Sequence, residues 1–349
     1  MRKLFFSFLT ILLLTGAAYA VELPASDMLP EGLAEAVEKD MLAGGVTWLA
    51  ESARSVLGSI LQDGTRDAAL LMLVAMICGA AEGLSDGMDA ASRYVPYCGV
   101  LAATTLAAGD LRALIGLGVQ TVDELGTLAK LLLPTLSAAL AAGGFVSTAS
   151  VWQVTTLMVC DALNELVARL LLPLVYCYIA AAAAGAMLGE ERLDLLADGV
   201  KKLVTGGLTA LIAGFAAYLS VAGVLTGSAD RTAVKVTKLA VSGAIPVVGG
   251  MLSEMTESVL AAAGTLRGTV GAVGVFAVGA VCLVPLLRLG VHFLLYRLAA
   301  FAAGLVGTKA LGGFLDRLGD AFALVFAMTA TCALILLVAL LVATATAAA

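Results

Sequence analysis

The sequence is poor in charged and aromatic residues, and this shortage argues against a water-soluble globular protein. Charged residues make up 13% of the 349 residues and aromatic residues 6%, whereas 61% are hydrophobic. A soluble domain carries about 25% charged residues. With a mean hydropathy of +1.04, the chain has too few polar side chains to cover a globule in water. We therefore predict a polytopic membrane protein.

The sequence also lacks the residue sets on which most enzymes and metal sites depend. It has one histidine, His292, and no serine nucleophile elbow, phosphate-binding loop or metal-ligand spacing. The formal charge of −6 and the lack of a basic cluster argue against nucleic acid as a partner. We predict a protein that is not an enzyme and that uses no cofactor or metal. No Cys-x-x-Cys pair occurs, and the six cysteines resemble small buried hydrophobic residues: Cys78, Cys98, Cys160, Cys177, Cys282 and Cys332.

The N-terminus has the pattern of a secretory signal peptide. Arg2 and Lys3 form a short basic region, residues 4–14 are apolar, and the Ala-Tyr-Ala sequence at 18–20 fits the small-x-small cleavage rule. We predict a signal peptide over residues 1–20 and a mature chain that begins outside the cytoplasm. The alternative is an uncleaved first anchor.

Residues 21–66 are predicted to form an extracytoplasmic segment. The part from Asp27 to Asp40 is acidic. From residue 46 to residue 61 the pattern predicts an amphipathic helix that is too polar to span a bilayer and lies on the membrane surface or on the rest of the protein. The apolar residues of this helix recur at helical spacing: Val46, Leu49, Ala53, Val56, Leu57, Ile60 and Leu61.

Residues 67–349 are predicted to form a multi-span transmembrane domain of the all-α class. A span needs about 20 apolar residues. The stretch 289–306 is ambiguous between a span and a surface helix, so six to nine spans are expected. The remaining candidates are 67–84, 94–109, 124–145, 166–188, 203–226, 240–263, 268–288 and 320–345.

The segment from Ser242 to Glu254 is predicted to be a broken helix within the membrane. Pro246 removes a backbone donor, and Gly249 and Gly250 lower helix stability. Backbone groups freed in this way are tolerated in lipid only where protein or trapped water satisfies them. These three residues are candidates for a hinge or constriction. The alternative is a kinked span with no special role.

Small and acidic residues follow the broken helix. Glu254 and Glu257 lie at i and i+3 on one helix face. Gly264, Gly268 and Gly271 recur every three or four residues and are candidates for a groove that packs against a neighbouring helix. The two glutamates are candidate polar residues within the membrane.

Asp161, Glu165 and Arg169 fall on one helix face at i, i+4 and i+8. Ionisable residues at membrane depth are costly and normally face a bundle interior or a water-filled cavity. Two roles stay open for these residues: an internal ion pair that stabilises helix packing, or the lining of a cavity.

Two further polar groups are interpreted as surface features. Asp194 and Asp198, with Lys201 and Lys202, have the spacing of a solvated helix with local i,i+4 pairs. His292 lies four residues from both Arg288 and Tyr296. We interpret that stripe as interfacial and near a helix end, and the alternative is a proton-sensitive site in the membrane.

Around Pro246 the sequence resembles the stage III sporulation protein AE family of endospore-forming bacteria. The resemblance includes the run Ile-Pro-Val-Val-Gly-Gly at 245–250 and the order of signal peptide, short acidic segment and many spans. About 40 residues in this region are distinctive. The other matching residues are Lys235 and Lys238 upstream, Ser253, Glu254, Glu257, Ser258 and Val259 in the acidic helix, and a Gly/Arg stretch that ends at Gly274.

The resemblance implies a non-enzymatic membrane core component of a sporulation channel complex that links mother cell and forespore. It implies a multi-pass protein in the mother-cell membrane around the forespore, which works with other membrane proteins of the complex as an oligomer and is required for late forespore development. Two alternatives remain from the residues alone: a stand-alone secondary permease for a small metabolite, and a membrane scaffold for partner proteins.

Overall fold

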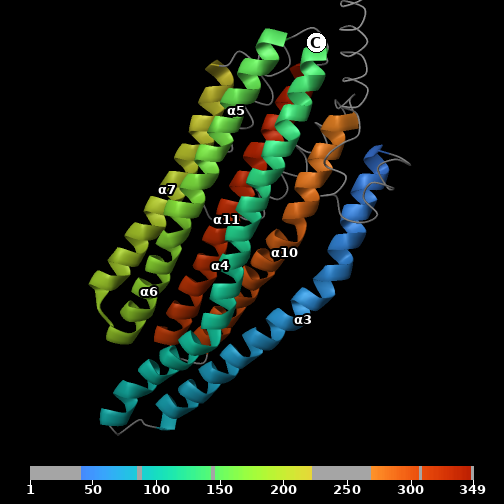
Figure 1. Ribbon diagram of the computed structural model, residues 1–349. Helices are drawn as coiled ribbons and strands as arrows, with labels where there is room; N and C mark the ends of the chain where they lie inside the picture. Colours follow the sequence, from blue (N-terminus) through green and yellow to red (C-terminus); the bar gives the residue numbers. More distant parts are fainter. Residues whose placement is uncertain (1–40, 85–88, 143–145, 222–268, 306–308, 347–349) are drawn as a thin grey trace, which may run out of the picture.

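The computed structural model describes residues 41–84, 89–142, 146–221, 269–305 and 309–346, and its elements are helices (Figure 1). No strand occurs in these ranges, in agreement with the predicted all-α class. A single π-helical turn, η2, interrupts the helical rod formed by α5 and α6. The elements in chain order are α3 (Met41–Leu84), α4 (Asp89–Ala142), α5 (Val146–Leu166), η2 (Val167–Leu171), α6 (Leu172–Leu188), α7 (Glu191–Val221), α10 (Thr269–Leu305) and α11 (Lys309–Thr346).

Six of the described helices are long and apolar enough to cross a membrane, with α5, η2 and α6 counted as one rod. Each is longer than the ~20 residues that a bilayer requires. The protein is therefore a multi-pass membrane protein. The candidate spans are Gly44–Leu84, Tyr97–Thr135, Val154–Leu188, Arg192–Leu219, Val273–Leu305 and Lys309–Val342.

Three helices continue through positions at which the sequence predicted boundaries. The expected span 94–109 and the described part of 124–145 both lie in α4, and the described parts of 268–288 and 289–306 are joined in α10. The amphipathic segment 46–61 is likewise the first part of α3 and not a helix of its own. Charged residues such as Asp110 and Arg112 lower local hydropathy, but they leave the backbone hydrogen bonds of a helix intact. The hydropathy pattern therefore predicted helix ends within α3, α4 and α10, where the backbone helix is continuous.

Helix α11 lies at the centre of the bundle. It contacts α10, α4, α6, α7 and α5, and nearly all its residues from 321 to 340 are buried. In Figure 1, α3 forms one side of the bundle and α5, α6 and α7 the opposite side, with α4, α10 and α11 between them. The apolar sequence of α11 is thus explained by the helices that surround it.

Small residues allow α10 and α11 to approach closely. A Cβ atom built on Gly312 would lie 3.3 Å from both the carbonyl oxygen of Ala300 and the backbone nitrogen of Gly304. Because these neighbours are backbone atoms of α10, they cannot move aside as a side chain could. The contact therefore depends on glycine at 312, as is common where membrane helices pack.

The rod formed by α5 and α6 changes its winding near a proline. In η2 the N–H of Leu172 donates to the carbonyl of Val167, five residues earlier. Pro173, in the first turn of α6, has no N–H to donate. The wider turn keeps the rod continuous at this point. Gly189, with φ of 64°, then ends α6 with a backbone bond to Gly185.

Several predicted features lie outside the described residues. These are the signal peptide 1–20, residues 21–40 of the segment 21–66, and the broken helix with Pro246, Gly249, Gly250, Glu254, Glu257, Gly264 and Gly268. Gly271 lies near the start of α10. The expected boundary between the extracytoplasmic segment 21–66 and the transmembrane domain 67–349 falls within α3, which is a continuous helix there.

Candidate functional site

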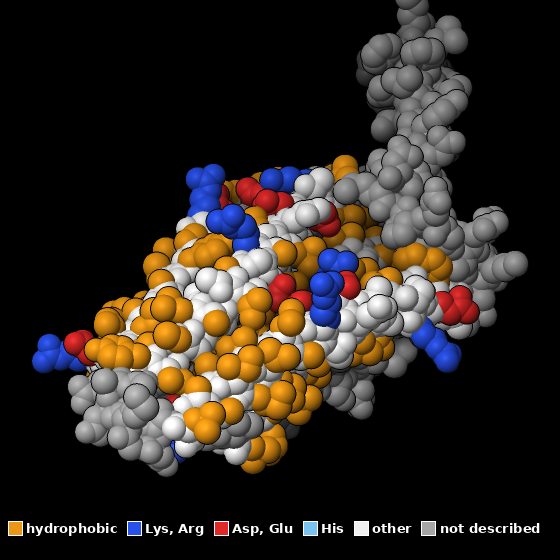
Figure 2. All heavy atoms as spheres, turned by 90° about the horizontal axis from the view of Figure 1, so that it is seen from below, with side chains coloured by type: hydrophobic (Ala, Val, Ile, Leu, Met, Phe, Trp, Pro, Cys, Tyr) orange, Lys and Arg blue, Asp and Glu red, His pale blue; other side chains and the backbone are white. Residues whose placement is uncertain are grey.

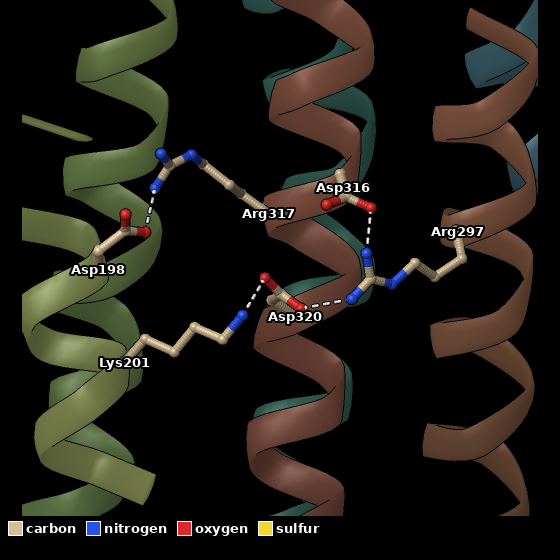
Figure 3. A network of polar contacts seen from close by, with 6 residues as sticks. All are labelled: Asp198, Lys201, Arg297, Asp316, Arg317 and Asp320. Carbon is tan, nitrogen blue, oxygen red and sulfur yellow. Dashed lines mark hydrogen bonds and ion pairs between the residues drawn. The ribbon is translucent and has the colours of Figure 1, made fainter. Parts of the chain in front are cut away.

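A network of ion pairs joins α7, α10 and α11 (Figure 3), and its side chains range from 12% exposed at Asp320 to 55% exposed at Asp198. Three of its members lie on one face of α7 because they are four and three residues apart, and two acidic members lie four residues apart on α11. Arg317 is the α11 residue directed toward α7. The full set is Asp194, Asp198 and Lys201 on α7, Arg297 on α10, and Asp316, Arg317 and Asp320 on α11.

Asp320 is the central acceptor of the network. Its Oδ2 accepts a hydrogen bond from Lys201 Nζ at 2.6 Å, and its Oδ1 accepts one from Arg297 at 2.8 Å. Figure 3 shows the two cations reaching this carboxylate from opposite sides. The Asp320 side chain is only 12% exposed. One carboxylate on the central helix thus connects α7 to α10.

The two arginines complete the connections. Arg297 also donates to Asp316, and its guanidinium lies 5.6 Å from the centre of the Phe293 ring. Arg317 reaches back to α7, where it pairs with Asp194 at 3.1 Å and Asp198 at 3.2 Å. Helices α7 and α11 are therefore linked by ion pairs in both directions. Lys201 of α7 pairs with a carboxylate of α11, and Arg317 of α11 pairs with carboxylates of α7.

The network is nearly neutral in total charge. It combines four carboxylates with three cations, so it carries one excess negative charge. All seven residues lie in helices long enough to cross a membrane. Removing one partner of a buried pair leaves the other charge uncompensated, which costs far more than an exposed pair contributes. The arrangement can hold three helices in a fixed register.

A second polar cluster lies beside the network, where α10 meets α3 and α4. The Tyr296 hydroxyl donates to Asp110 Oδ2 at 3.0 Å, and the Tyr296 ring packs edge-on to Phe322 with 4.8 Å between centroids. His292 is buried, with Nδ1 2.8 Å from the Arg288 carbonyl oxygen. His292 and Tyr296 therefore face the interior of the bundle.

The predicted polar residues of the α5 rod lie on the surface of the chain. Asp161 pairs with Lys130 of α4 at 2.7 Å, and Glu165 pairs with Arg169 at 2.9 Å. These four side chains are 54–80% exposed. The first pair joins two helices and the second stays within one rod. Neither is brought to the ion-pair network.

An open hollow runs along α4 next to these pairs. It has a volume of about 580 Å³, and the Gln120 amide there donates to Glu124 at 2.7 Å. Within the described ranges no group of three or more His, Cys, Asp or Glu side chains is placed to hold a metal ion. The hollow is lined by Gly116, Val119, Gln120, Asp123, Glu124 and Thr127.

Sequence reasoning singled out only part of the network. It noted Asp194, Asp198 and Lys201 but assigned them local pairs on a solvated helix, whereas the structure pairs them with α11. Arg297, Arg317 and the α11 aspartates were not noted. The sequence feature that could have indicated them is the four-residue spacing of Asp316 and Asp320, directly before the uncharged run 321–346. Two carboxylates on one face of so apolar a helix indicate that this face packs against other helices.

The fold and the network define a multi-pass membrane protein, all-helical in the part that the structure describes, in which ion pairs join α7, α10 and α11. A family model described as Stage III sporulation protein AE matches residues 47–347. The chain belongs to this family, which confirms the resemblance seen around Pro246.

One relative is the Stage III sporulation protein AE of Bacillus subtilis (strain 168). It is 23% identical over 237 residues, which cover 68% of this chain and 59% of the relative. The chain thus spans about three fifths of the length of that relative. No solved structure matches the chain.

Proposed function

We propose that this protein is the non-enzymatic membrane core of a sporulation channel complex that links mother cell and forespore. It acts in the mother-cell membrane around the forespore, together with other membrane proteins of the complex and further copies of itself. Family membership supports the place in sporulation, and six helices long enough to span support the role of a membrane core.

The observation that carries the proposal is the ion-pair network inside the spanning helices. Charged side chains at membrane depth are costly, and they occur where helices must be held around a functional centre. Asp320, with Lys201 on one side and Arg297 on the other, fixes α7 and α10 against α11. A channel core needs such a rigid frame, against which a hinge such as Pro246, Gly249 and Gly250 can move.

The direct test is deletion of the gene, followed by complementation. The proposal predicts that the deletion strain completes engulfment, fails in late forespore gene expression and forms no heat-resistant spores. Wild-type protein restores spores and purifies from sporulating cells with other membrane proteins. Normal spore yield from the deletion strain would overturn the proposal.

A stand-alone permease is the second candidate, because the same network could bind a charged solute. The two functions separate in proteoliposomes that contain only this protein. A permease moves its solute there without partners, whereas a channel component does so only with the rest of its complex. The scaffold alternative predicts partner binding without solute movement in either case.

A further inference from the structure

We infer that a lipid bilayer surrounds only one half of this bundle, and that the other half stands in water. The enclosed half contains the α6–α7 connection, the end of α10, the start of α11 and the adjoining ends of α3 and α4, all at the bottom of Figure 1. Its outer surface, from Arg66 of α3, Arg112 of α4, Arg169 of the α5–α6 rod and Arg288 of α10 down to those ends, is called the lipid belt below. The assignment does not depend on the proposed function.

The first observation is where large hydrophobic side chains are exposed. Seen from this end, hydrophobic side chains are spread over the surface, and charged ones gather in small groups (Figure 2). In water this much exposed apolar surface would be unfavourable, but acyl chains fit it. The lipid belt exposes Leu70, Leu73, Met76, Ile77, Leu101, Leu106, Tyr176, Leu188, Leu195, Leu196, Leu203, Leu294, Leu298, Phe301 and Leu305.

The second observation is an exposed arginine at the upper edge of the belt on each of four helices. These are Arg66, Arg112, Arg169 and Arg288. From each arginine to the lower end of its helix the distance is ~26–35 Å at 1.5 Å per residue. This matches the ~30 Å hydrocarbon core of a bilayer. A guanidinium at that height can bind lipid phosphate.

Contacts between helices relate the heights of three of these arginines in the bundle. The hydrogen bond between Asp110 and Tyr296 sets the level of Arg112 against α10. A Cβ on Gly64 would meet Leu295 and His292 of α10, which sets the level of Arg66. Arg66 and Arg112 therefore lie beside residues 292–296 of α10, and Arg288 lies about two turns further up that helix. The four arginines are called the rim below.

The third observation is that the half beyond the rim has the polarity of a water-soluble bundle. Its central helix α11 is apolar and buried, whereas α3, α4 and α5 expose charged and polar side chains. Each charge at mid-bilayer would cost ~2.5–3.5 kcal/mol on an insertion scale. The exposed polar side chains there include Glu51, Arg54, Ser55, Ser59, Gln62 and Asp63 on α3, Gln120, Asp123, Thr127 and Lys130 on α4, and Asp161 and Glu165 on α5.

Few residues depart from this division. Beyond the rim, the exposed large hydrophobic side chains among the described residues are Val46, Leu61, Val154, Met158 and Leu166. Within the belt Lys202 is exposed, and its long stem can carry the ammonium toward the lipid surface. Asp194 and Asp198 are about half exposed but pair with Arg317. The ion-pair network itself then lies within the bilayer, enclosed by the belt.

The test is labelling with a membrane-impermeant maleimide in proteoliposomes that have reagent on both sides. Because Cys98 and Cys177 lie in the belt and the other four cysteines are buried, the wild-type protein should remain unlabelled until it is denatured. In a background with alanine at 98 and 177, Gln120→Cys and Thr127→Cys should react rapidly. Met76→Cys and Phe301→Cys should react at least about tenfold more slowly, because the reactive thiolate needs water.

Spin labels at positions 127 and 301 then distinguish lipid from a covering protein. A spin label at 301 that is surrounded by lipid collides often with oxygen and rarely with a water-soluble nickel chelate. A label at 127 that is in water collides often with the nickel chelate and less often with oxygen. The inference is overturned if Thr127→Cys resists the maleimide, if Phe301→Cys reacts as fast as Thr127→Cys, or if the label at 301 is shielded from both oxygen and nickel. Five labelled thiols per chain after denaturation, the introduced one and the four buried ones, show that the introduced thiol is intact.

Discussion

Asp320 has the most demanding environment of the ionised residues in the network. It is nearly buried, and its two oxygens accept from cations on two different helices. Its negative charge is stabilised only while both partners stay in place. Lys201 and Arg297 keep 31% and 38% of their side chains exposed, so the protein encloses them less completely than it encloses the carboxylate. The carboxylate therefore matters more for stability than either cation alone.

Replacing Asp320 by Asn should destabilise the folded protein by about 3 kcal/mol. This is the lower end of the range for breaking a buried pair, because the two cations remain partly exposed. Thermal unfolding in detergent measures the change. The matched control is Glu165→Gln, which removes a carboxylate from the exposed pair with Arg169 and should cost no more than about 1 kcal/mol. Equal shifts in the two variants would contradict the central place of Asp320.

The exposed pair of Lys130 and Asp161 should behave as a surface ion pair. Asp161→Asn should change the free energy of unfolding by about 1 kcal/mol or less, since both side chains are more than half exposed. The small effect should fade as salt is raised from low ionic strength. A large, salt-independent loss on thermal unfolding would show that a partner encloses this pair.

Residue spacing in the sequence predicts which side chains share a face but not what that face meets. The i,i+4 spacing of Glu165 and Arg169 is consistent with the pair observed. Asp198, by contrast, pairs with Arg317, 119 residues away in sequence, and no local pattern contains that partner. The network could be predicted as polar faces on α7 and α11, but not as one assembly.

At the scale of elements, hydropathy predicted helices correctly and their ends poorly. Charged residues such as Asp110 in α4 interrupt an apolar run without breaking the backbone, and α10 continues through Pro285. The all-helical class could therefore be predicted from composition and period. The lengths of α3, α4 and α10 could not, because they depend on neighbours that accept or cover the charged positions.

The contact between α10 and α11 should be sensitive to a side chain at 312 but not at 313. Gly312→Leu places atoms against the backbone of Ala300 and Gly304, so we expect the helices to separate and stability to fall by about 1–3 kcal/mol or more. Gly313→Leu is the matched control, since nothing lies within 4 Å of a Cβ there. Thermal unfolding that responds equally to both substitutions would contradict the close packing.

The predicted broken helix around Pro246 lies outside the described residues and keeps its status as a hypothesis. If Gly250 acts in a hinge of the channel, Gly250→Leu should block development after engulfment, because a bulky side chain removes the backbone freedom of glycine. Spore counts and protein level in the membrane measure this. A scaffold without a moving part predicts normal spores from the same variant at normal protein level.

At the scale of the whole molecule, the two halves of the bundle have opposite polarity. In the half enclosed by the lipid belt, the outside is mostly apolar and the ion-pair network joins three helices. In the other half the interior is apolar and α3, α4 and α5 expose polar side chains. The overall composition combines the residues of both halves in one value. It therefore predicted a membrane protein, but it could not show which part of the bundle lies in the bilayer.

This division gives the network a physical role in the proposed channel core. Within the bilayer, ionised side chains are stable only when paired, so they hold helices together more specifically than apolar packing does. The half in water is free to contact other components of the complex. A rigid centre in the membrane and a polar extension outside it fit a component that connects a membrane to an assembly.

The most direct test of the account is the sporulation of a strain whose only copy of the gene carries Lys201→Gln. This change removes one cation from Asp320 on the partly exposed side of the network, and it should leave enough stability for the protein to accumulate in the membrane. We predict engulfed forespores, loss of late forespore gene expression and few heat-resistant spores at wild-type protein level, with Glu165→Gln sporulating normally. Normal spores from Lys201→Gln would contradict a functional role for the network.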